Sequence, residues 1–302
     1  MRKPWRGTLM DNIFDKKYYF CANKRLRYNV RLQSANEQES VVACRFIFKD
    51  VLLTKIMKRS TLFTIKIILF VLLFSACNRE NKQQNIILNA VRDVDGNHYD
   101  AVRIGDQVWM KTNLRTKHFR DRSPISVGEA SSDKPFVYEP TTTELPGYDN
   151  KNYGLYYNWS AVNDERGLCP KGWHVPSNGE WTELEDYLGS RVEYCYNGRP
   201  YAMAYSIAST NGWNIDSTFV YWEGGSPGYS PAENDATGFS AIPAGLWDHV
   251  YEGAGKYAFF WSSTPYDSHM AWYCRLSDWS DGIRRYMDKK DYGFSVRCLR
   301  DK

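Results

Sequence analysis

The sequence predicts an α+β fold built from short, mostly antiparallel strands, one or two helices and long loops. Residues 90–114 alternate apolar and polar side chains around two turn signals. Residues 177–189 carry a complete helix signature, and several short strand-like runs follow between residues 238 and 299. Strands, then a helix, then strands again, without a repeat of fixed period, are typical of a single α+β domain.

The first predicted element is a short β-meander over residues 90–114. It contains "DVDGNHY", in which Asp95-Gly96 supplies a hairpin turn, and "IGDQVWM", which supplies a second turn before another strand. The following region, 121–150, is rich in Pro, Thr, Ser, Gly and Asp and is predicted to be a long loop.

The strongest helix signal lies in "LCPKGWHVPSNGEWTELEDYLGS" (168–190). Ser177 is the expected N-cap and Glu180 follows three residues later, which is the capping-box pattern. Apolar residues then recur at helical spacing, and Gly189 is expected to close the helix. Just before this block, "YGLYYNWSAV" (153–162) is predicted to begin as a strand and to become helical by Ala161.

Short strands are predicted in the last quarter of the chain, at 238–245, 258–263, 271–277 and 292–299. Tryptophan contributes much of the apolar volume. We expect four tryptophans to lie in the core: Trp109, Trp173, Trp181 and Trp261.

The segment "MKRSTLFTIKIILFVLLFSACNRE" (57–80) resembles the start of an exported protein. A positively charged start, a short apolar run and the small pair Ser75-Ala76 precede Cys77, as in the lipobox of bacterial lipoproteins. We therefore expect a signal peptide over 57–76 and a lipid on Cys77, followed by a polar tether over 77–89. Residues 1–56 are interpreted as an upstream start that is not part of the mature protein, the alternative being a genuine cytoplasmic extension.

Charge excludes one class of partner for the expected mature chain. Residues 77–302 hold 24 basic and 30 acidic residues, a net charge of −6, so a nucleic-acid partner is not expected. Four further cysteines follow Cys77. An even number in an exported protein suggests two disulfides, with three connectivities open: Cys169, Cys195, Cys274 and Cys298.

Six motifs in order resemble the Fibrobacter succinogenes major paralogous (FISUMP) domain, over residues 90–302. They are "DVDGNHYDAVRIGDQVWMKTNL", "YGLYYNWSA", "GLCPKGWHVPSNGEWTELEDYLG", "GFSAIPAG", "FWSST" and "GFSVRCL". The resemblance implies an exported lipoprotein or surface protein. It also implies a C-type-lectin-like fold, which is shared with the sulfatase-modifying group of enzymes.

The same resemblance implies how the cysteines pair. Lectin-like folds commonly tie the helix block to the final strand, so Cys169 is expected to pair with Cys298. Cys195 and Cys274 would then form an inner pair.

The sequence contains no motif that clearly indicates catalysis or metal binding. Asp93, Asp95 and Asn97 resemble part of a calcium loop, but the spacing fails and a hairpin turn explains them. The lectin tripeptides Glu-Pro-Asn and Gln-Pro-Asp are missing, and no nucleophile–base arrangement can be named. His174 is expected to make a structural hydrogen bond at the helix start. We therefore predict no enzyme activity, no metal and no cofactor.

The remaining signal is a concentration of aromatic residues among Gly, Ser, Asp and Asn over 213–279, a composition typical of recognition surfaces. The candidate ligand-surface residues are Trp222, Tyr229, Trp247, Tyr266 and Trp279. "DST" (216–218) also resembles a bacterial O-glycosylation acceptor, with Ser217 as the acceptor.

These inferences predict an outer-membrane lipoprotein that is anchored by its lipid and binds glycan or protein at the cell surface. Which face of the membrane carries the domain stays open. The first alternative is a structural, pilus-like or adhesive assembly subunit. The second is an enzyme of the sulfatase-modifying type, which a pair of reactive thiols would favour.

Overall fold

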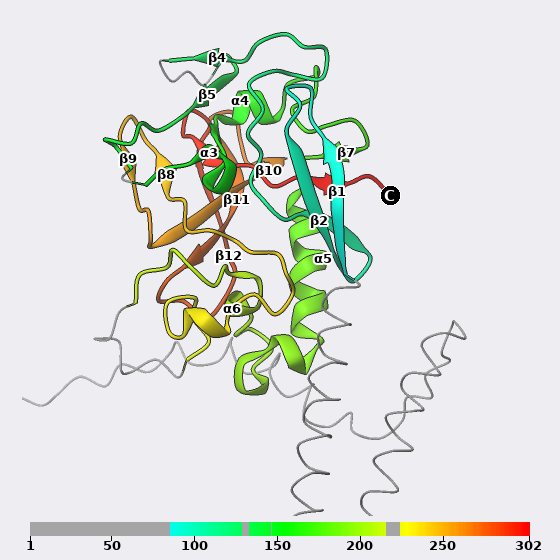
Figure 1. Ribbon diagram of the computed structural model, residues 1–302, viewed down its shortest axis with the longest axis vertical. Helices are drawn as coiled ribbons and strands as arrows, with labels where there is room; N and C mark the ends of the chain where they lie inside the picture. Colours follow the sequence, from blue (N-terminus) through cyan, green and yellow to red (C-terminus); the bar gives the residue numbers. More distant parts are fainter. Residues whose placement is uncertain (1–84, 129–132, 146, 216–223) are drawn as a thin grey trace, which may run out of the picture. The chain divides into compact units, whose positions relative to one another are not determined.

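The computed structural model describes residues 85–128, 133–145, 147–215 and 224–302. Its first sheet has five strands and is antiparallel throughout (Figure 1). In spatial order these are β1 (Ile86–Arg92), β2 (His98–Ile104), β3 (Gln107–Met110), β14 (Leu299–Arg300) and β7 (Trp173–His174). The predicted meander is therefore confirmed as β1, β2 and β3. Gly105 has a φ of +60° in the two-residue turn that joins β2 to β3, a conformation that favours glycine.

The second sheet has seven strands and mixes long antiparallel ladders with short parallel pairs. Its spatial order is β12 (Arg284–Lys289), β11 (Met270–Ser277), β10 (Tyr257–Pro265), β13 (Phe294–Ser295), β6 (Tyr156–Tyr157), β5 (Phe136–Tyr138) and β4 (Ser126–Val127). The β10–β13 and β4–β5 pairs are parallel. A separate hairpin pairs β8 (Leu246–Trp247) with β9 (Tyr251–Glu252).

The longest helix among the described residues is α5 (Asn178–Gly189). Its capping box forms as predicted: Ser177 Oγ accepts from the Glu180 amide, and the Glu180 carboxylate accepts from the Ser177 amide. Short helical turns make up the rest: α3 (Asn150–Tyr153), α4 (Trp159–Val162), α6 (Ala204–Ile207), η1 (Val192–Tyr194), η2 (Tyr196–Gly198) and η3 (Pro231–Glu233). In the described part of the chain, no helix combines the length and apolarity that crossing a membrane requires.

The core consists of two apolar clusters, and α5 closes one of them. Trp181, Leu184 and Leu188 of α5 are buried with side chains from both sheets. Trp181 lies 4.7 Å from Trp109 of β3 and 5.8 Å from Phe260 of β10, measured between ring centroids. In the other cluster, Trp261 stacks on Phe294 at 4.3 Å. Trp173 is buried in this second cluster as well, so all four tryptophans predicted to be core residues are buried.

Two element predictions are wrong, and one strand was not predicted. The region 121–150, expected to be a long loop, also contains β4 and β5. The run 238–245 is not a strand: the Asp235 carboxylate accepts from the Ser240 amide, and Ser240 has a φ of +57°, which interrupts an extended backbone. The sequence interpretation missed β12, whose residues RRYMDK are mostly charged because the strand lies at the sheet edge.

A buried arginine joins the last strands to the rest of the core. Arg297 is fully buried and lies over the rings of Phe239 and Phe260. Its guanidinium donates to Asn113 Oδ1 and to the carbonyls of Met110, Phe239 and Ser240. Burial lowers the pKa of Arg297 to about 9. A pKa of about 9 still leaves Arg297 mostly protonated at neutral pH, and the four acceptors compensate in part for the burial of its charge.

Candidate functional site

The structure describes four of the five residues predicted to form one ligand surface, and it does not bring those four together. Tyr229, Tyr266 and Trp279 are 56%, 50% and 42% exposed, whereas Trp247 is only 8% exposed. Trp222 lies outside the described residues, as do Ser217 and Cys77. Three of the five are therefore accessible, and Tyr266 lies apart from the other two.

Trp247 was wrongly predicted to be a surface residue. Its ring lies 5.1 Å from both Phe136 and Tyr138, two residues of β5. Its backbone also pairs with Gly293 in both directions. Trp247 is thus a packing residue that joins the β8–β9 hairpin to the seven-stranded sheet.

Tyr266 is exposed but lies far from the other two aromatics. It follows β10 and meets Trp272 edge to face at 5.4 Å. Pro265 pairs with Ala271 at this end of the β10–β11 ladder, and Tyr257 pairs with Ser277 at the other end, next to Trp279. The nine residues of β10 place the two ends roughly 25 Å apart.

Tyr229 and Trp279 lie on neighbouring loops. The Gly228 amide donates to the Asp278 carbonyl at 2.8 Å. A Cβ at Gly228 would come within 2.5 Å of the Asn214 carbonyl oxygen and 2.7 Å of that of Asp278, so only glycine allows the two loops this close. Gly228 precedes Tyr229 and Asp278 precedes Trp279, so this backbone contact fixes where both aromatic residues leave their loops.

Two further tyrosines and an arginine extend this region. Tyr196 meets Tyr229 edge to face at 6.1 Å and packs on the Gly224-Gly225 backbone. The Arg199 guanidinium lies 5.7 Å from the rings of Tyr196 and Tyr201 and 3.5 Å from the Asp281 carboxylate. We call this set the aromatic surface: Tyr196, Arg199, Tyr201, Tyr229, Trp279 and Asp281.

The aromatic surface combines exposed rings with hydrogen-bonding groups. Tyr201 is 46% exposed. Partial desolvation and the neighbouring Tyr229 raise the pKa of Tyr196, which therefore stays a neutral hydroxyl at physiological pH. Ring faces can stack on the apolar face of a sugar, and hydroxyl, guanidinium and carboxylate groups can bond its hydroxyls.

Sequence analysis missed Tyr196, Arg199 and Tyr201. They belong to "YNGRPY", a turn-rich segment with two tyrosines and an arginine, and that composition was a usable signal for a recognition loop. Figure 1 places the segments around α6, which include this loop, at the end of the fold away from β4 and β5.

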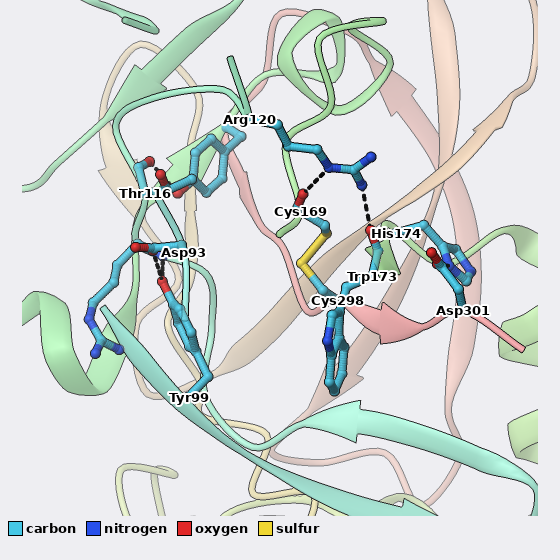
Figure 2. Close-up of a disulfide and its surroundings, with 11 residues drawn as sticks. Asp93, Tyr99, Thr116, Arg120, Cys169, Trp173, His174, Cys298 and Asp301 are labelled. Carbon is cyan, nitrogen blue, oxygen red and sulfur yellow. Dashed lines mark hydrogen bonds and ion pairs between the residues drawn. A yellow bond between two sulfur atoms is a disulfide. The ribbon is translucent and has the colours of Figure 1, made fainter. Parts of the chain in front are cut away.

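The cysteines confirm one predicted disulfide and contradict the other. Cys169 and Cys298 are joined, as Figure 2 shows. Cys195 and Cys274 are buried thiols that form no disulfide. The Cys195 sulfur is directed at the carbonyls of Leu188 and Gly189 at the end of α5, whereas Cys274 is buried within β11. Burial raises the pKa of the Cys274 thiol, so it does not supply a reactive thiolate.

The acidic residues of "DVDGN" are structural. The Asp93 carboxylate accepts from the amides of Asp95 and Asn97, from Asn97 Nδ2 and from the Tyr99 hydroxyl. The Asp95 carboxylate accepts from Thr116 Oγ1 and the Lys117 amide. These acids fix the β1–β2 turn, as the sequence interpretation preferred. The residues that the structure describes contain no cluster of metal-ligating side chains.

His174 has the structural role expected of it. Its Nε2 lies 2.9 Å from Glu180 Oε1 at the start of α5, and its Nδ1 lies 2.7 Å from Asp301 Oδ1. The histidine therefore joins the capping box of α5 to the end of the chain. Figure 2 shows the side chains of His174 and Asp301 next to each other.

These features define a mostly antiparallel α+β domain with one disulfide between its helix block and its final strands. A model of the Fibrobacter succinogenes major domain matches residues 102–300, and the chain belongs to this family. The resemblance seen in its motifs is thereby confirmed. No curated protein and no solved structure matches the chain.

Proposed function

We propose that this chain is a non-catalytic binding protein that recognises glycan through the aromatic surface. The observation that carries the proposal is that the exposed residues Tyr229 and Trp279 lie on two loops joined by the hydrogen bond from the Gly228 amide to the Asp278 carbonyl. Both rings are exposed, and Tyr201 adds a third. Rigid aromatics lose little conformational entropy on binding, which makes such a surface suited to a polyhydroxylated ligand.

The C-type-lectin-like relationship is part of the same proposal. It is supported by the disulfide between Cys169, which precedes α5, and Cys298, which precedes β14. It is also supported by long loops that carry exposed aromatics on a two-sheet framework. Sugar binding here would rely on stacking against the exposed rings of Tyr201, Tyr229 and Trp279.

The absence of catalysis is likewise proposed. It is supported by the raised pKa of the Cys274 thiol, because the sulfatase-modifying alternative needs a reactive thiol.

We also propose that the domain is held at the bacterial outer membrane by lipid on Cys77. The signal-like order of charge, apolar run and small residues over 57–77 supports this. The intact mass of protein purified from its native membrane tests it. A mass for residues 77–302 plus lipid is expected, and a product that retains residues 1–56 would contradict it.

Glycan recognition is tested by probing a glycan array with the full chain in detergent. Wild-type protein is expected to bind a defined set of glycans, and the Tyr229→Ala/Trp279→Ala variant is expected to lose them. Concentration-dependent self-association that the same variant abolishes, without glycan binding, would instead show that the aromatic surface contacts another copy of the chain.

A further inference from the structure

A second candidate site lies away from the aromatic surface, in a cleft of about 470 Å³. It is formed by the β1–β2 turn, the loop around residue 120 and the segment after Cys169. Its volume is within the range of small-molecule sites. Four cationic side chains line it: Arg92, Arg120, Arg122 and Lys171.

The two carboxylates next to these cations in the sequence, Asp93 and Asp121, accept hydrogen bonds from other parts of the protein. Asp93 lines the cleft, but its carboxylate accepts four hydrogen bonds from Asp95, Asn97 and Tyr99. Asp121, next to Arg122, accepts from the amide and hydroxyl of Ser123. Neither acid is hydrogen-bonded to a cation of the cleft.

The cations therefore keep their charge available. Among the residues that the structure describes, Arg92, Arg122 and Lys171 make no ion pair and no side-chain hydrogen bond. Arg120 donates only to neutral acceptors, the carbonyls of Cys169 and Trp173. Four cations line the cleft with one acid, Asp93, so the cations repel one another and an anion bound between them would relieve that repulsion.

The cleft is also held in shape before any ligand binds. Figure 2 shows the Arg120 guanidinium bridging two carbonyls beside the Cys169–Cys298 disulfide. A Cβ at Gly167 would come within 2.8 Å of the Arg120 side chain, so glycine is needed where the two loops meet. The opposite wall is fixed by the hydrogen bonds to Asp93. Pre-organised donors lower the entropic cost of binding.

We propose that this cleft binds a small ligand through an oxyanion group: a carboxylate, a sulfate or a phosphate. Arginine presents paired N–H donors that match these groups bidentately. The volume indicates a ligand larger than a bare ion. The site goes beyond the proposed glycan surface, because Figure 1 places the β1–β2 turn at the end of the fold opposite the segments around α6.

Isothermal titration of the full chain tests this inference. The probes are glucuronate, glucose 6-sulfate, glucose 6-phosphate and inorganic phosphate, with glucose as the neutral control. At least one of the acidic sugars is expected to bind, more tightly than inorganic phosphate and more weakly as salt rises, and glucose is not expected to bind. Binding of inorganic phosphate alone would reduce the site to an ion site and overturn the proposal.

Variants locate the binding. Arg92→Gln, Arg122→Gln and Lys171→Gln are each expected to weaken binding about three- to tenfold, and the triple variant to abolish it. Arg103→Gln is the matched control, because Arg103 is an exposed cation at the other end of β2. Equal binding by wild type and the triple variant, or no binding to wild type, would overturn the proposal. Tyr229→Ala/Trp279→Ala leaves this binding unchanged, which separates the two sites.

Discussion

At the scale of single residues, Arg297 shows how a polar group can hold an apolar core together. Its guanidinium has no carboxylate partner among its hydrogen bonds, yet it satisfies three backbone carbonyls and the Asn113 side chain. Without those donors the buried acceptors would be left unpaired, at a cost of about 1–3 kcal/mol each.

The variant Arg297→Lys is expected to lower the free energy of unfolding by about 3 kcal/mol. A single ammonium nitrogen cannot reach acceptors that surround a planar guanidinium. Denaturant titration followed by tryptophan fluorescence measures the change. Arg300→Lys, at an exposed position in the next strand, is the control and should change stability by less than about 0.5 kcal/mol. Equal effects from both would contradict this role for Arg297.

Glu185 of α5 is a second residue with unusual energetics. Burial raises its pKa to about 7, even though Arg285 lies 3.4 Å away. Arg285 also donates to the Asn178 carbonyl and to Thr182 Oγ1, and Glu185 Oε1 is buried without a hydrogen-bond partner. Desolvation therefore outweighs the attraction of the ion pair.

Stability is expected to depend on pH because of Glu185. Between about pH 4.5 and pH 7 the folded protein keeps this proton while the unfolded chain releases it. The free energy of unfolding should thus fall as the pH rises through this window, by roughly 3 kcal/mol.

Glu185→Gln should remove that fall and should be more stable than wild type at pH 8, as measured by urea unfolding at several pH values. Glu183→Gln, an exposed position in the same helix, should leave the fall intact. An unchanged pH profile in Glu185→Gln would show that another group is responsible.

At the scale of elements, the Cys169–Cys298 disulfide joins the segment before α5 to the end of the chain, 129 residues away. Its loss should lower the free energy of unfolding by about 4 kcal/mol, because cross-linking a long loop restricts the unfolded chain. The free energy of unfolding of the variant Cys169→Ser/Cys298→Ser, compared with that of disulfide-bonded wild type, measures this. Alkylation of denatured, unreduced protein should label Cys195 and Cys274 but not the disulfide pair. Label on Cys169 would contradict the pairing.

Elements that depend on residues close together in the sequence could be predicted. Elements that depend on their place in the folded sheet or on contacts with other segments could not. The capping box of α5 depends on two residues three positions apart, and the β2–β3 turn on one glycine. The edge strand β12 was not predicted, because its charged residues suit a sheet edge but do not alternate between apolar and polar side chains. The run 238–245 was wrongly predicted to be a strand because a hydrogen bond from Ser240 to Asp235 decides its backbone.

The candidate sites were also hard to predict, because they depend on contacts between segments that are distant in the sequence. Trp247 was misjudged because its packing partners, Phe136 and Tyr138, lie more than 100 residues away in the sequence. The cationic cleft could not be predicted because its side chains come from three separate segments. Tyr229 and Trp279 were chosen correctly as exposed residues, but their meeting depends on a contact between the Gly228 and Asp278 backbones.

At the scale of the whole molecule, the fold presents different chemistry at its two ends. The loops around α6 carry exposed aromatics, and the end near the β1–β2 turn carries unpaired cations (Figure 1). Tyr266 belongs to neither set, since it lies at the far end of the β10–β11 ladder from Trp279. It therefore serves as an internal control: an exposed aromatic of similar accessibility outside the aromatic surface.

The central claim is that glycan binds at the aromatic surface, and the most direct test is the affinity of an array-selected glycan for three forms of the full chain. By isothermal titration, Trp279→Ala should weaken binding at least tenfold relative to wild type, since a stacked ring is lost. Tyr266→Ala should bind as wild type does. Equal affinity of wild type and Trp279→Ala, or an equal loss in both variants, would contradict the claim.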